Sequence, residues 1–99
     1  MNILCFGQTG QVAIELARQA YLIGATVDCL DRERADLTAP DACAALVAAT
    51  DADIIVNAAA YTAVDAAETD SATAQTVNGD SPGAMARAAA ARDLPFLHI

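Results

Sequence analysis

The chain has 99 residues, the size of one small domain with a modest hydrophobic core. Its residues are 56% apolar but only 4% aromatic, and no run approaches the roughly 20 apolar residues of a membrane-spanning helix. The net charge of −8 argues against nucleic acid or an anionic membrane as a partner. The three cysteines lack metal-ligand spacing, so we expect reduced core residues and no metal site.

The first thirteen residues predict a strand, a glycine turn and the start of a helix. An apolar strand at residues 3–6 leads into Gly7, which can adopt the positive φ of a sharp turn. Gly10 has no Cβ to keep a pyrophosphate from the backbone, and Ala13 lets the helix pack closely on the strand. The free N–H groups and dipole of the helix start favour a diphosphate. Glycines three apart also occur in a plain strand-to-helix turn.

A helix over residues 10–23 follows, ended by Gly24. Its apolar positions, which we expect to face the sheet, are Val12, Leu16, Ala20 and Ile23. A second strand at residues 25–30 ends at Asp31, about 20 residues after the glycine turn, where a carboxylate can accept a hydrogen bond from a ribose 2′-OH.

The next helix runs to about residue 49, with Thr38 as its N-cap and Asp41 completing a weak capping box. We expect it to bury Cys43, Leu46 and Val47. Residues 53–57 form a third strand. Its β-branched, non-alternating sequence is typical of a parallel sheet covered on both faces.

Residues 58–65 are small and polar, which suits a loop near a ligand at the carboxyl edge of the sheet. Residues 66–92 are helical in composition, with a kink or a division into two segments expected near residues 79–82. A fourth strand occupies residues 95–99. The alternation of strands and helices predicts an α/β fold. We expect part of a Rossmann-type, doubly wound parallel sheet with strand order 3-2-1-4.

The run VNAAAYTAVDAAE at residues 56–68 resembles the hallmark that follows the third strand in the dTDP-4-dehydrorhamnose reductases, a branch of the extended short-chain dehydrogenase/reductases. The match continues through residues 7–12 and the pair Val77-Asn78. It covers essentially the whole chain but only the first third of such an enzyme. We therefore expect residues 1–99 to be the amino-terminal part of an NAD(P)-binding Rossmann domain, with the substrate domain absent.

The resemblance implies a site for NADP or NAD. Its residues are Gly7 in the turn, Gly10, Gln11 and Val12 at the pyrophosphate, Asp31 or Arg32 at the adenosine ribose, Asp36 and Leu37 at the adenine, Ala58 and Ala59 in the loop, and Ala60, Tyr61 and Thr62 at the nicotinamide-side ribose.

Several of these residues also have a purely structural interpretation. Asp36 can be a solvated loop charge, residues 58–60 a packing strip of small side chains, and Tyr61 an exposed loop aromatic. Asn57 can be a turn former at a strand end. For His98, the single histidine, we favour a strand residue over a catalytic base.

The resemblance also implies a reaction. The family reduces a 4-keto sugar with a Tyr-x-x-x-Lys pair, in which the lysine lowers the pKa of the tyrosine so that it can deliver a proton. The 99 residues contain no lysine, since all five cationic side chains are arginines. We therefore expect no catalytic residue here and no activity from the chain alone.

For the full-length parent we expect NAD(P)H-dependent reduction of dTDP-4-dehydro-L-rhamnose to dTDP-L-rhamnose, for a cell-envelope polysaccharide. The alternatives are a non-catalytic nucleotide-binding regulatory subunit and another extended short-chain reductase acting on a nucleotide sugar. A strand so near Met1 leaves no room for a signal peptide, so a cytoplasmic location is expected. For the full-length parent we also expect a homo-oligomer.

Overall fold

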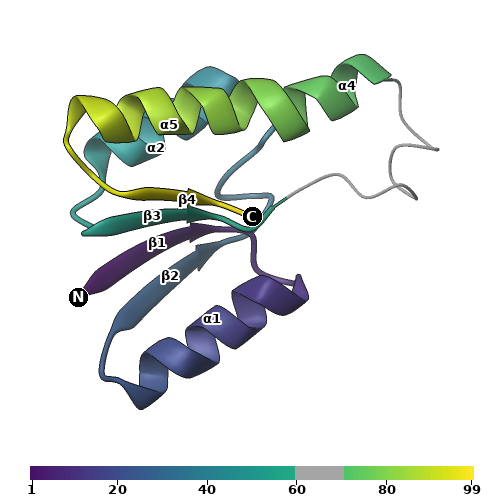
Figure 1. The fold of residues 1–99 in the computed structure, drawn as a ribbon. Helices are drawn as coiled ribbons and strands as arrows, with labels where there is room; N and C mark the ends of the chain where they lie inside the picture. The colour runs from purple at the N-terminus through teal and green to yellow at the C-terminus, as the bar shows by residue number, and fades with distance from the viewer. Residues whose placement is uncertain (60–70) are drawn as a thin grey trace.

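The computed structural model describes residues 1–59 and 71–99. Parallel pairing joins its strands, which are β1 (Asn2–Phe6), β2 (Thr26–Leu30), β3 (Ile54–Asn57) and β4 (Phe96–His98). The helices are α1 (Gln11–Leu22), α2 (Pro40–Ala49), α4 (Ser71–Gln75), the π-helix η1 (Thr76–Asp80) and α5 (Ser81–Ala91). α1 covers one face of the sheet, and α2 and α5 cover the other (Figure 1). The predicted doubly wound α/β fold is confirmed.

The strand order is β2-β1-β3-β4, so the predicted order 3-2-1-4 is wrong. β3 pairs with β1, and no strand of the described part lies outside β2. β2 suits an edge because Thr26 and Asp28 are exposed, whereas Ile55 and Val56 of β3 are buried, as an interior strand requires. The chain therefore reverses its direction across the sheet directly after β2. This places the topological switch, where open α/β sheets bind ligands, between β1 and β3.

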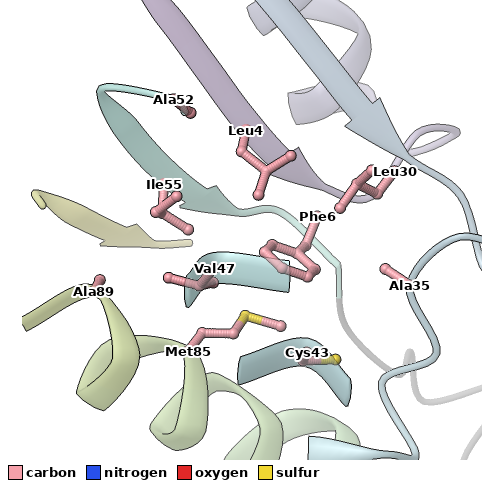
Figure 2. Close-up of a cluster of buried hydrophobic side chains, with 10 residues drawn as sticks. All are labelled: Leu4, Phe6, Leu30, Ala35, Cys43, Val47, Ala52, Ile55, Met85 and Ala89. Carbon is pink, nitrogen blue, oxygen red and sulfur yellow. The ribbon is translucent and has the colours of Figure 1, made fainter. Parts of the chain in front are cut away.

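The larger core lies between the sheet and the helix pair α2 and α5. Phe6 from β1, Val47 from α2 and Met85 from α5 converge there (Figure 2), and all three are 0% exposed. The smaller core, on the α1 side, consists of Cys5, Ala13 and Val56. Because α1 packs through alanine, it lies close to the strands, as the small side chain at position 13 predicts.

The buried stripe of α1 differs from the predicted one. Ala20 is buried and Leu16 is partly buried, as expected, but Val12 and Ile23 are 43% and 76% exposed. The second fully buried position is Ala13, seven residues before Ala20 and so on the same side of the helix.

The interruption predicted near Pro82 is a π turn. The N–H of Ser81 donates to the carbonyl of Thr76, five residues back, and α5 begins directly after this widened turn. Proline has no N–H to give to the carbonyl four residues back, and its ring clashes with that carbonyl, so a wider turn relieves the strain. The part of the predicted helix before residue 71, and the loop after residue 59, lie outside the described residues.

α2 and α5 are also tied together by a side chain. Arg92, just beyond α5, donates through one guanidinium nitrogen to the carbonyls of Val47 and Thr50 at the end of α2, at 2.7 Å each. It thereby satisfies carbonyls that lack partners at a helix end. In the described part of the chain, no helix is long and apolar enough to cross a membrane.

Candidate functional site

A cavity of about 550 Å³ lies at the carboxyl edge of the sheet, where β1 and β2 end and α1 begins. Its lining includes seven residues predicted for the site: Gly7, Gly10, Asp31, Arg32, Leu37, Ala58 and Ala59. It also includes five residues that were not predicted: Gln8, Thr9, Leu30, Glu33 and Ala35. Sequence position could have indicated four of these five. Gln8 and Thr9 lie inside the glycine turn, and Glu33 and Ala35 follow β2.

Gly7 forms the sharp turn that leads out of β1. Its φ is +113°, and its N–H donates to the carbonyl of Leu30 at 3.0 Å. A Cβ at this position would lie 3.2 Å from both the Ala58 carbonyl carbon and the Ala59 nitrogen. The turn is therefore pressed against the exit of β3, and both the backbone angle and the available space require glycine.

Gly10 differs from Gly7 in what surrounds it. Its backbone is extended, with φ −72° and ψ 156°, and a Cβ built on it would meet nothing within 4 Å. It is the N-cap of α1 and makes no side-chain cap hydrogen bond, and the first turn contains no acidic residue. The N–H groups at the start of α1 therefore lie beside open space at the positive end of the helix dipole, an arrangement that suits an anion.

Gln11 and Val12 do not line this cavity. Their side chains border a separate, exposed depression on α1, together with Glu15, Leu16 and Gln19. Any contact they make with an anion at the start of α1 is therefore through their main-chain N–H groups.

Charged residues gather where β2 ends. Asp31 accepts a hydrogen bond from the N–H of Arg34 at 2.9 Å, which closes the turn after β2. The guanidinium of Arg34 instead pairs with both carboxylate oxygens of Asp28 at 2.8 Å, and this pair lowers the pKa of Asp28. Among the described residues, Arg32 is the one cationic side chain in the cavity lining, which also contains Asp31 and Glu33.

A smaller cavity of about 190 Å³ adjoins the first. The two share Arg32, Ala35, Leu37 and Ala59, and the smaller one is further lined by Asp36, Thr38 and Val77. Val77 is 6% exposed, so η1 brings an apolar wall to this side of the site. The described residues thus form an apolar slot next to the charged group at the end of β2.

Asp36 stabilises its own loop. Its Oδ1 accepts from the N–H of Thr38 at 2.9 Å and from the Thr38 hydroxyl at 2.6 Å, and these bonds lower the pKa of Asp36. Thr38 is therefore not an N-cap, and the predicted capping box is wrong: α2 begins at Pro40, after Ala39, without a side-chain cap. Asp36 is exposed, in agreement with its plainer interpretation as a solvated loop charge.

Two buried groups hold the 36–38 loop from behind. The hydroxyl of Ser81, at 0% exposure, donates to the carbonyl of Leu37 at 2.6 Å. The thiol of Cys43 donates to the carbonyl of Asp36 at 3.3 Å. The wall of the smaller cavity is thus anchored to both α5 and α2.

The loop after β3 is fixed by the last residue of that strand. The side-chain oxygen of Asn57, which is fully buried, accepts from the N–H of Ala59 at 3.2 Å. Its plainer interpretation as a turn former at a strand end fits this bond. Three further predicted site residues, Ala60, Tyr61 and Thr62, lie outside the described residues.

The arrangement is chemically suited to an anionic nucleotide. A phosphate would lie beside the start of α1, a ribose near the polar side chains after β2, and a flat apolar ring in the slot beside Leu37. The open space over Gly10 is the observation that fits a bound group best, because the fold itself leaves that space unfilled.

Comparison with known proteins identifies the family to which this sequence is similar. A family model described as the RmlD substrate binding domain matches residues 1–99. A dTDP-4-dehydrorhamnose reductase from Burkholderia thailandensis is 50% identical over 88 residues, covering 89% of this chain and 29% of the relative. The enzyme of that name from Escherichia coli K12 is 45% identical over 92 residues, covering 90% and 31%.

Solved structures agree. A crystal structure of a dTDP-4-dehydrorhamnose reductase from Clostridium acetobutylicum has a TM-score of 0.84 and 28% identity, covering 97% of this chain and 34% of that one. One from Yersinia enterocolitica has the same TM-score and 26% identity. The chain spans about a third of the length of the relatives it matches.

Proposed function

Because this chain belongs to the family of the dTDP-4-dehydrorhamnose reductases, we propose that it binds the adenosine and pyrophosphate part of NADP or NAD in the cavity at the carboxyl edge of its sheet. The whole protein would use the reduced cofactor to convert dTDP-4-dehydro-L-rhamnose to dTDP-L-rhamnose. The open, uncapped start of α1 above Gly10 is the observation that carries this proposal.

Each portion of the adenosine and pyrophosphate part has a counterpart among the described residues. Main-chain N–H groups at the start of α1 would hold the pyrophosphate, and the backbone turn at Gly7 would keep that helix end in position. Asp31, whose Oδ1 is already used by its own turn, retains Oδ2 for a ribose hydroxyl. Leu37 and Ala35 would contact the adenine.

A cofactor bound there would supply the hydride for reduction of the sugar carbonyl. The chain's contribution is to bind and orient the cofactor, and the Tyr-x-x-x-Lys pair that the family uses for proton transfer is not among these 99 residues. The 99-residue chain, incubated with dTDP-4-dehydrorhamnose and NADPH, is therefore expected to show no turnover above a buffer blank.

Calorimetric titration of the 99-residue chain with NADPH and NADH tests the binding site. We expect saturable binding of at least one cofactor, and its loss in Gly10→Val, whose side chain would fill the space over the helix start. Ile14→Val is a matched control, because Ile14 lies exposed on α1 and does not line the cavity. Absence of binding by the folded chain, or unchanged binding by Gly10→Val, would contradict the proposal.

Assay of the full-length protein separates the reductase from the regulatory alternative. A reductase is expected to oxidise NADPH only when the 4-keto sugar is added. Cofactor binding without turnover, together with the lack of a downstream Tyr-x-x-x-Lys pair, would favour a non-catalytic nucleotide-binding subunit.

A further inference from the structure

Cys5 and Cys29 lie side by side on neighbouring strands. They are Cα partners in the parallel register of β1 and β2, so their side chains point to the same face of the sheet, the one that α1 covers. The two side chains are near enough that Cys29 raises the pKa of Cys5 and Cys5 lowers the pKa of Cys29. Cys5 is fully buried, and Cys29 is partly exposed. The two therefore form a dithiol with one member open to solvent.

The spacing is close to what a disulfide needs. Neighbouring strands lie about 4.8 Å apart, and disulfides join Cα atoms roughly 4.4–6.8 Å apart, with Cβ atoms about 3.5–4.5 Å apart. Register partners therefore meet the Cα requirement, and a small inward tilt of the two Cα–Cβ bonds brings the sulfurs together.

The third cysteine provides an internal comparison. Cys43 belongs to the core on the opposite face of the sheet, where its Sγ lies 3.3 Å from the carbonyl oxygen of Asp36. It is fully buried and separated from Cys5 and Cys29 by the sheet itself. Cys43 is therefore not a partner for either of them in the folded chain.

We propose that Cys5 and Cys29 are a redox-sensitive pair that a peroxide converts to an intramolecular disulfide. Peroxide first oxidises the accessible Cys29 thiol to a sulfenic acid and leaves as water. The Cys5 sulfur then attacks the Cys29 sulfur, the S–S bond forms, and the sulfenic oxygen leaves as a second water molecule. Two thiols lose two electrons in total, which one peroxide accepts.

The surroundings set the pH dependence. Burial raises the pKa of Cys5 to about 12, and burial also raises the pKa of Cys29, with Asp28 adding to the effect. α1 contributes no charge at its contact, since it packs through Ala13 and Leu16. Both groups are thiols at neutral pH, and the thiolate is the reactive form, so closure is expected to be slow at pH 7 and to accelerate as the pH rises.

The disulfide would lie directly below the proposed phosphate site. The Cys5 Sγ is 3.8 Å from the carbonyl oxygen of Gly7, and the Cys29 Sγ is 4.0 Å from that of Ala13. The pair joins the two strands from which the glycine turn and Asp31 extend. The chemistry itself is independent of the proposed function, because it needs only the two thiols and an oxidant.

Peptide mapping tests the link directly. The folded chain is treated with hydrogen peroxide at about pH 8, where some thiolate forms, and is then cleaved with trypsin without reduction. The arginines put the three cysteines into separate peptides: 1–18, 19–32 and 35–87. We expect peptides 1–18 and 19–32 to be joined with a loss of about 2 Da, and dithiothreitol to separate them.

Two variants sharpen the test. Cys43→Ala is expected to leave the link unchanged, and Cys29→Ala is expected to abolish it, with circular dichroism confirming that both are folded. A link through peptide 35–87, a link only between two chains, or irreversible oxidation of Cys29 without a link would overturn the proposal. Phenylarsine oxide, which bridges adjacent thiols, gives a second readout that needs no oxidation. Wild type and Cys43→Ala should each bind one molecule of it per chain, and Cys29→Ala should bind none.

Discussion

Asn57 donates its side-chain N–H to Nδ1 of His98 at 3.1 Å and thereby joins the carboxyl ends of β3 and β4. The orientation of the amide follows from its other bond, since the oxygen accepts from the N–H of Ala59. The nitrogen can only donate, so Nδ1 of His98 accepts, and the ring carries its proton on Nε2. One buried side chain thus fixes both the loop beside the cavity and the tautomer of the single histidine.

Asn57→Ala is expected to lower the free energy of unfolding by about 2–3 kcal/mol, because it leaves the Ala59 N–H without its partner and opens a void in a buried position. His98→Ala should cost less than about 1 kcal/mol, since His98 is exposed. Urea unfolding followed by circular dichroism measures both. Equal losses for the two variants would show that Asn57 does not have this anchoring role.

Alanine substitutions at the two glycines of the turn are expected to differ in their effect on stability. Gly7→Ala forces a side chain onto a φ of +113° and against the Ala58–Ala59 backbone, so we expect a loss of about 1–3 kcal/mol. Gly10→Ala, in extended backbone beside open space, should cost less than about 1 kcal/mol. Thermal unfolding of both variants checks the difference, and a larger loss for Gly10→Ala would refute it.

Cofactor choice is expected to be weak. Asp31 favours a free ribose 2′-OH, while Arg32 in the same lining can pair with a 2′-phosphate. Affinities for NADPH and NADH should therefore differ by less than about 100-fold, or 2.7 kcal/mol. Arg32→Ala should weaken NADPH binding more than NADH binding, whereas Arg18→Ala, on the exposed side of α1, should change neither. A preference above that limit would show that one side chain dominates.

β4 is expected to mediate self-association of the 99-residue chain. It pairs only with β3 in the described part, and Leu97 and Ile99 are 56% and 63% exposed. An unpaired strand edge is a template for another chain, and burying a few hundred Å² of apolar area at about 25 cal/mol/Å² would stabilise the contact by several kcal/mol. Sedimentation at micromolar concentration checks this. A folded monomer whose sedimentation is the same in Leu97→Lys would rule the idea out.

Features that depend on a few neighbouring residues could be predicted from the sequence. The turn at Gly7 follows from its position between an apolar strand and a helix start, and the break near Pro82 follows from the missing N–H. The resemblance to the reductase family, made mainly on residues 56–68, is confirmed by the family match over residues 1–99. Part of that run lies outside the described residues, and the roles implied for Ala60, Tyr61 and Thr62 stay predictions.

Features that depend on distant partners could not be predicted in the same way. The β-branched, non-alternating sequence of residues 53–57 indicates a strand covered on both faces but does not say which strands lie beside it, so the strand order was predicted wrongly. Thr38 has the right chemistry for an N-cap, but Asp36 competes for it through two hydrogen bonds. The slot beside Leu37 depends on Val77, which is forty residues away in sequence and is brought there by η1.

The widened turn at η1 also affects the direction of the side chains along the helix. A π turn contains one residue more than an α turn needs, and each residue of an α-helix advances the direction of its side chains by about 100°. Counted by residue number, the side chains of α4 are therefore offset by about 100° from where an unbroken α-helix would place them, although α4 and α5 follow one another as nearly one rod (Figure 1). Removing a single residue from 76–80 would therefore restore regular winding and leave the side chains of α4 facing their present neighbours, whereas removing one from a regular turn of α5 would rotate them by about 100°.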